Sequence, residues 1–258
     1  MPPADVPPLV WPAPARTDRH HPDTSSPGFQ DPSASLNPSL KVGDQIAEVV
    51  ALHQRVNGKE ARRRAVDALS LLNLSDPPRV ADAYPFQLSG GMRQRVMIAM
   101  MLSCHPKLLI ADEPTTSVDV TTQMQILKEL DALIRRLGTS IILITHDLGV
   151  VANFTDRTAV IYGGVTCEIA PTNQLLGFPQ HPYTRALLEA MIDLDRLGRR
   201  PQAIPGDSPD PGRRGQGCPF VLRCPAALDR CREERPGLRQ VADNHLAACH
   251  LFPSDKPG

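Results

Sequence analysis

The sequence has no excess of either charge and no long apolar run. Its 28 Lys and Arg residues balance 28 Asp and Glu residues, so the net charge at pH 7 is zero. This balance gives no overall attraction to nucleic acid or to an acidic membrane surface. No apolar run approaches the roughly 18 residues that a membrane-spanning helix needs, and no secretory signal is visible. We therefore expect a cytosolic protein, held at the inner face of the membrane through a partner.

Residues 1–28 lack lysine, contain a single glycine and include eight prolines. Proline fixes φ and removes a backbone hydrogen-bond donor, and the segment has few aliphatic residues with which to form a core. We expect it to be extended or disordered.

From residue 29 onward, apolar residues recur at spacings typical of regular structure. Two stretches, 42–56 and 59–74, have helical spacing, and a third helix is expected from Ser89 to about Ser103. After residue 104, short apolar runs alternate with amphipathic stretches, which indicates an α/β fold with a parallel sheet. The expected elements are buried strands at 108–111 and 141–145, helices at 120–137 and 147–154, a hairpin of 158–162 and 165–169, and helices near 172–177 and 182–193.

The segment Leu88-Ser89-Gly90-Gly91 opens the third helix with two glycines. Each glycine costs a helix about 1 kcal/mol relative to alanine, so the pair makes sense where another molecule approaches the backbone closely. Free N–H groups and the positive end of the helix would hold a phosphate there. An ordinary N-cap at Ser89 is the plainer alternative.

Two adjacent carboxylates, Asp112 and Glu113, follow directly on the apolar run 108–111. Ligands of open α/β sheets bind at the carboxyl ends of the strands, and neighbouring acids repel each other unless a cation or proton intervenes. This pattern predicts a cation site. An acidic turn continued by Pro114 is the alternative.

Three segments together resemble the ATP-binding subunits of ABC transporters: LSGGMRQR (88–95), LLIADEPTTSVD (108–119) and IILITHD (141–147). The resemblance implies a P-loop NTPase core that binds ATP and Mg²⁺, with residues 41–104 as the helical signature subdomain. It also implies a dimer in which the D-loop of one subunit crosses to the other. The residues expected to contact nucleotide through the signature and D-loop motifs are Ser89, Gly90, Gly91, Gln94 and Asp119.

The same resemblance assigns roles at the reaction centre. Asp112 would hold Mg²⁺ through water, Glu113 would be the base that orients the attacking water, and His146 would contact the γ-phosphate. Gln30, within FQDPSASLNP, matches the Q-loop, which reaches Mg²⁺ and the attacking water and touches the membrane subunit.

A second string, HPYTR (181–185) followed by two leucines, is similar to the C-terminal extension of oligopeptide and dipeptide importer ATPases. Pro182 alone would also suit the first turn of any helix. The resemblance implies an ABC ATPase domain at 29–177 and the extension at 178–258. It also implies a location at the cytoplasmic face of the membrane. The implied partners are a second ABC ATPase subunit, transmembrane permease subunits and, indirectly, a peptide-binding protein.

Four of the six cysteines lie close together in the sequence: Cys218, Cys224, Cys231 and Cys249. In a cytosolic protein such a cluster favours a metal or cofactor over disulfides. The absence of paired C-x-x-C motifs favours an iron–sulfur cluster over zinc, although spacing leaves zinc and unliganded thiols open. The segment also resembles the tail of the same importer ATPases, some of which hold a 4Fe–4S cluster.

No G-x-x-x-x-G-K-[ST] phosphate loop occurs in the 258 residues. We expect residues 1–28 to be a start unrelated to the family, and the loss of the phosphate-loop strand to leave unpaired strand edges in an incomplete core. The expected function is that of a peptide-importer ATP-binding subunit, which couples ATP hydrolysis to transport and supplies its signature motif to a partner's ATP site. The alternatives are a non-hydrolysing pseudo-ATPase subunit and an inactive gene fragment.

Overall fold

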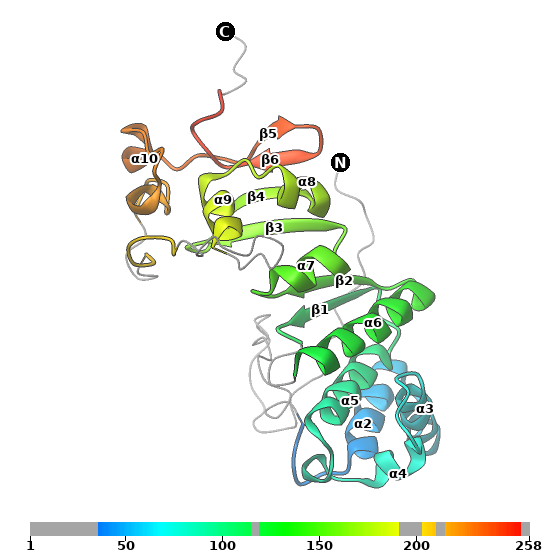
Figure 1. The fold of residues 1–258 in the computed structure, drawn as a ribbon. Helices are drawn as coiled ribbons and strands as arrows, with labels where there is room; N and C mark the ends of the chain where they lie inside the picture. Colours follow the sequence, from blue (N-terminus) through cyan, green and yellow to red (C-terminus); the bar gives the residue numbers. More distant parts are fainter. Residues whose placement is uncertain (1–35, 115–118, 191–202, 210–214, 254–258) are drawn as a thin grey trace. The chain divides into compact units, whose positions relative to one another are not determined.

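A computed structural model describes residues 36–114, 119–190, 203–209 and 215–253 of the chain (Figure 1). Its contacts divide the protein into an N-terminal unit, residues 1–150, and a C-terminal unit, residues 151–258. Each unit is described by itself. Within the described ranges, no helix is both long enough and apolar enough to span a bilayer.

The N-terminal unit begins with a group of four helices. Side-chain caps fix where three of them begin: Asn57 accepts a hydrogen bond from Glu60 N, Asp76 accepts one from Arg79 N, and Ser89 accepts one from Met92 N. The helices that the sequence predicts in this stretch are therefore present. The elements of this group are α2 (Val42–Gln54), α3 (Gly58–Ser70), α4 (Pro77–Asp82), the 3₁₀ turn η1 (Pro85–Gln87) and α5 (Gly90–Leu102).

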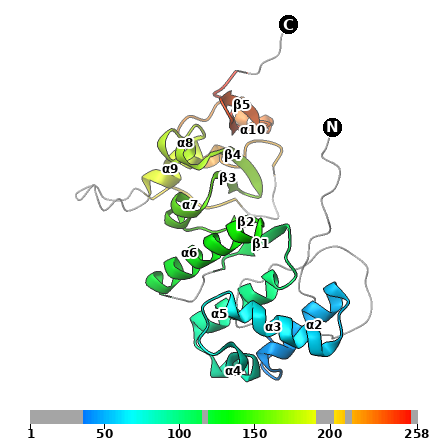
Figure 2. The same ribbon diagram turned by 90° about the vertical axis from the view of Figure 1, so that its right-hand side faces the viewer.

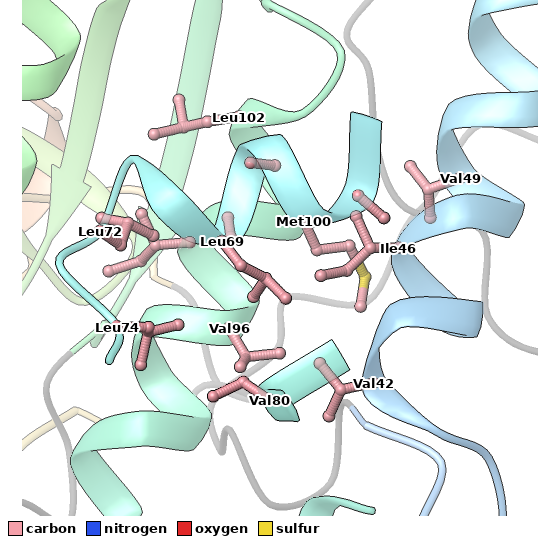
Figure 3. Packing of buried hydrophobic residues seen from close by; sticks show 14 of the residues in the cluster. Val42, Ile46, Val49, Leu69, Leu72, Leu74, Val80, Val96, Met100 and Leu102 are labelled. Carbon is pink, nitrogen blue, oxygen red and sulfur yellow. The ribbon is translucent and has the colours of Figure 1, made fainter. Parts of the chain in front are cut away.

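Apolar side chains from all four helices pack into one core. Figure 3 shows Ile46 of α2, Leu69 of α3 and Met100 of α5 gathered in it, with Val80 of α4 beside them. Ile46 and Leu69 have no exposed surface. Fully burying such a side chain contributes roughly 1.5–3 kcal/mol, so this core is the main support for the position of α5.

Arg62 on α3 joins three helices at the surface of this core. Its guanidinium donates to Asp44 Oδ1 of α2 at 2.7 Å, to Asp82 Oδ1 of α4 at 2.9 Å and to Ala81 O at 3.2 Å. The side chain is 31% exposed. Because one side chain serves three partners while partly shielded, it contributes more than an ordinary surface ion pair.

We expect Arg62→Met to lower the free energy of unfolding by about 1–2 kcal/mol, since three hydrogen bonds between helices are lost. Urea unfolding measures the change. Arg63→Met is the matched control, because Arg63 is 63% exposed and pairs only with Glu60 and Asp67 of its own helix. That variant should stay within about 0.5 kcal/mol of the wild type. Equal losses in the two variants would contradict the role of Arg62.

After the helices, the N-terminal unit continues with a parallel strand pair and a long helix. β1 (Leu108–Asp112) pairs with β2 (Ser140–Ile144) in parallel register, Leu108 opposite Ser140. α6 (Val120–Leu137) runs alongside both strands (Figures 1 and 2). It begins after Asp119, which accepts from Thr122 N, and ends at Gly138, whose φ is 67°. This confirms the expected parallel pairing.

β2 differs from the buried strand that the apolar run predicts. Ile142 and Ile144 are each 48% exposed. A continuous apolar run predicts cover on both faces of a strand, but β1 is the only strand that pairs with β2 among the described residues. The helix α7 (Leu148–Phe154) follows and crosses the boundary between the units.

The C-terminal unit is built on an antiparallel sheet with the strand order β3-β4-β6-β5. β3 (Arg157–Tyr162) and β4 (Val165–Pro171) form the predicted hairpin, and Gly163 and Gly164 take the positive φ that its two-residue turn requires. Two strands that the sequence did not reveal, β6 (His245–Ala247) and β5 (Arg239–Ala242), extend this sheet from β4. The short helices are α8 (Thr172–Gly177), α9 (Pro182–Glu189), η3 (Val221–Arg223) and α10 (Arg230–Glu233).

Candidate functional site

Glu113 and His146 meet at the carboxyl ends of β1 and β2. The Oε1 atom of Glu113 lies 2.5 Å from His146 Nδ1 and also accepts from His146 N at 3.1 Å. This hydrogen bond raises the pKa of His146 above its ordinary value, and the nearby negative charge adds to the effect. The structure thus brings together two residues that lie 33 positions apart in the sequence.

The backbone at Glu113 holds an unusual conformation for this contact. Its φ is 46°, in the left-handed region that a side chain with a Cβ seldom adopts, and its N–H donates to Ile144 O at 2.9 Å. Asp112, the last residue of β1, lies directly before it. Mg²⁺ is usually held by one or two carboxylates together with water and substrate phosphates. The position of Asp112 therefore suits a magnesium ligand and that of Glu113 a base, and Glu113 is hydrogen-bonded to His146.

The signature segment forms the first turn of α5. Ser89 is exposed and caps the helix, and Gly90 and Gly91 follow with their backbone only partly covered. A Cβ added at Gly91 would lie 3.2 Å from Thr122 Cγ2 of α6, so the second glycine also permits close packing of the two helices. Farther along, Arg95 and Glu129 join α5 to α6 through two hydrogen bonds of 3.1 Å.

Two residues that were not predicted from the sequence contact the predicted motifs. The first is Thr122, which packs on Gly91 and donates its N–H to Asp119 Oδ1 at 2.9 Å. The second is Gln123, whose amide Nε2 donates to Asp147 Oδ2 at 3.2 Å. Asp147 is the residue that follows His146 in the sequence. No sequence signal marks either residue, because each acts through a contact between separate elements. Backbone and side-chain donation from Thr122 holds the pKa of Asp119 below its ordinary value.

The remaining predicted residues have different environments. Gln94 is buried on α5, 1% exposed, and neither polar atom of its side chain has a hydrogen-bond partner in the described ranges. In this structure its side chain is therefore not accessible to a nucleotide. Gln30, Ser117 and Val118 lie outside the described residues.

The four clustered cysteines line one small cavity in the C-terminal unit, together with His181 and Phe220. All four are free thiols, and Cys218 N donates to Cys231 O at 2.8 Å. Burial raises the pKa of the thiols of Cys218, Cys224 and Cys249. Protonated thiols of this kind are unreactive until a cation stabilises the thiolate.

The cavity measures about 10 Å³, close to the space of one water molecule. Among the described residues, no three His, Cys, Asp or Glu side chains converge closely enough to hold a metal ion. The cavity therefore does not match a closed zinc site, which needs four ligands around one ion. A four-iron cluster binds each thiolate through a different iron and so needs a wider arrangement. The residue types suit a cluster, and its insertion would require the cysteine loops to move apart.

Comparison with known proteins identifies both parts of the chain. The family described as "ABC transporter" matches residues 14–116, and the one described as "Oligopeptide/dipeptide transporter, C-terminal region" matches residues 167–231. The oligopeptide transport ATP-binding protein AppD of Bacillus subtilis is 46% identical over 88% of this chain and 69% of its own length. The dipeptide transport ATP-binding protein DppD of Escherichia coli is also 46% identical, over 89% of this chain and 70% of its own.

The chain belongs to the ATP-binding subunits of oligopeptide and dipeptide ABC importers. Among solved structures, CbiO1 of Clostridium perfringens, part of an ABC transporter complex, has a TM-score of 0.51 and 30% identity over 58% of each chain. Membership of the ABC ATPase family implies ATP and Mg²⁺, in agreement with the expected cofactors. The ligand of the cysteine cavity and the role of each site residue remain predictions.

Proposed function

We propose that this chain couples ATP hydrolysis to the uptake of short peptides by completing the nucleotide site of a partner ATPase subunit. The observation that carries the proposal is the first turn of α5. Ser89 is exposed at the tip, two glycines leave the backbone accessible, and the helical core fixes the axis of α5. Such a tip presents free N–H groups and the positive helix end to a phosphate.

In this proposal the partner supplies the phosphate loop and permease subunits hold the pair at the membrane. Asp112, Glu113 and His146 belong to the second site of the pair, for which the 258 residues contain no G-x-x-x-x-G-K-[ST] motif. The names of the relatives AppD and DppD, which refer to oligopeptide and dipeptide transport, support peptide transport as the process in which the chain takes part.

We also propose that Cys218, Cys224, Cys231 and Cys249 hold an iron–sulfur cluster, with zinc as the less suited ligand. What supports this proposal is that all four cysteines line one cavity. In the present arrangement no three metal-binding side chains of the described residues converge, so the proposal does not rest on a preformed site. The cluster would supply a rigid link between the loops that carry these cysteines.

The ATPase rate of a mixed pair tests the first proposal. The chain is purified, mixed with a peptide-importer ATPase subunit that has a complete phosphate loop, and assayed with Mg-ATP. We expect no hydrolysis by the chain alone and a rate for the mixture well above the sum of the separate rates. If the pair copurifies without a gain in rate, the pseudo-ATPase alternative is favoured. If the two do not associate, the inactive fragment is favoured.

A further inference from the structure

Glu168 of β4 is a fully buried carboxylate that joins three segments of the C-terminal unit. It has no exposed surface. Oε1 accepts from Gln180 N at 2.7 Å and lies 2.6 Å from His245 Nε2 of β6, and Oε2 accepts from His181 N at 2.9 Å. A buried carboxylate is costly unless it is fully hydrogen-bonded, so these contacts require β4, β6 and the HPYT segment to be assembled together.

His181, the first residue of the HPYT segment, continues this network toward the cysteines. It is 2% exposed, and its Nδ1 accepts from Tyr183 N at 3.0 Å as the cap of α9. His181 also lines the small cavity together with Cys249. Burial lowers the pKa of His181 to about 4, so the ring is neutral at pH 7, as an Nδ1 acceptor must be.

Ala248 immediately precedes Cys249, and its own N–H donates to Cys167 O at 2.8 Å. The backbone before Cys249 is therefore held by β4 and, through His245, by Glu168. The same carboxylate holds His181, which lines the cavity with Cys249. Cys218 and Cys231 are joined differently, by the hydrogen bond between their own segments. Cys249 thus reaches the cavity from the β6 side, separately from these two cysteines.

We propose that Glu168 and His181 are positioning residues that hold Cys249 against the other three cysteines, so that the HPYT segment forms part of the thiol site. The inference rests on the proposed four-cysteine site but not on which metal fills it. The inference gives the HPYT segment a physical role. The backbone N–H of His181 binds Glu168, and His181 lines the cavity that contains the cysteines.

The test is the alkylation rate of each cysteine in the reduced, metal-free full-length chain, followed by peptide mass spectrometry with iodoacetamide as the probe. In Glu168→Gln an amide N–H replaces a carboxylate oxygen and faces a hydrogen-bond donor. His181→Ala removes the side-chain cap of α9 and the imidazole that lines the cavity. We expect Cys249 to react about tenfold faster in both variants, since a buried hydrogen bond is lost in each. His181→Asn, which keeps a capping acceptor, should restore part of the protection.

Two controls, a distant cysteine and a neighbouring variant, distinguish a local change at Cys249 from unfolding of the chain. Cys104 lies in the N-terminal unit and should react at its wild-type rate. Gln180→Ala should change nothing, because the Gln180 side chain bonds only to Phe178 O and its backbone N–H is retained. Unchanged Cys249 rates in both variants would overturn the inference, as would a uniform acceleration that includes Cys104.

Iron and acid-labile sulfide, measured after anaerobic reconstitution, give a separate readout. Iron bound per chain should fall in Glu168→Gln and His181→Ala and remain in Gln180→Ala. A wild-type chain that takes up no iron, while Cys249 still becomes reactive in the two variants, would reject the proposed cluster and leave the positioning role supported.

Discussion

Ser89→Arg should lower the ATPase rate of the mixed pair by about 100-fold or more. The side chain lies exposed at the tip of α5, so a long cation would occupy the space that a phosphate needs and would remove the capping hydroxyl. Loss of one preorganised donor at a reacting phosphate or oxyanion costs 10²–10³-fold in rate. The fold should survive, because losing an N-cap costs only about 1 kcal/mol.

A matched control comes from the cap of another helix in the same unit. Asn57 is exposed and caps α3 by accepting from Glu60 N at 2.9 Å. Asn57→Arg removes the same kind of cap and introduces the same cation, but the change lies away from the tip of α5. It should leave the ATPase rate within about twofold of the wild type. An equal loss in both variants would attribute the effect to stability.

Glu113→Gln distinguishes the two nucleotide sites of the pair. Glu113 is paired with His146 at the ends of β1 and β2 and belongs to the site that this chain builds itself. If hydrolysis occurs in the partner's site, losing this carboxylate should change the rate by no more than about twofold, whereas removing an active general base costs 10²–10⁴-fold. A large loss with Glu113→Gln and a small one with Ser89→Arg would reject the proposed division of roles.

Local patterns predicted most of the N-terminal unit. The helical period gave α2, α3 and α5, the Ser-Gly-Gly start located the first turn of α5, and Gly138 marked the end of α6. The position of Asp112 and Glu113 at the end of β1 followed from the rule that ligands of open α/β sheets bind at the carboxyl ends of the strands, whereas the contact of Glu113 with His146 was found only in the structure. In these cases the information lies within a few residues of the element concerned.

The parts that sequence could not predict depend on distant contacts. The strand β6 is only three residues long and pairs with β4. Its residue His245 contacts Glu168, which lies 77 positions earlier in the sequence. A glutamate inside the apolar strand VTCEIAP was the available signal, because a charge there needs buried partners. The exposure of Ile142 and Ile144 does not follow from the apolar run itself, since such a run does not reveal which neighbours cover it. The expectation of unpaired strand edges came instead from the missing phosphate-loop strand.

The second large effect is expected at Gly217, which lies beside Cys218. A Cβ at this position would lie 2.5 Å from Cys231 O and 2.6 Å from Arg232 O, both backbone atoms that cannot rotate away. Gly217→Ala should therefore separate the two segments and break the hydrogen bond from Cys218 N to Cys231 O. We expect iron retained after reconstitution to fall at least about tenfold, the usual result of disturbing the support of a metal ligand.

Gly237→Ala is the control for this change, because a Cβ at Gly237 meets nothing within 4 Å. It should retain iron at the wild-type level. A readout without metal is the alkylation rate of Cys218 in the apo chain, which should rise in Gly217→Ala as the half-buried thiol becomes more accessible. Because the substitution adds one methyl group and changes no ligand, a loss confined to Gly217→Ala would show that the spacing of the cysteine segments determines the thiol site. Normal iron and an unchanged Cys218 rate would mean that these segments can separate without cost.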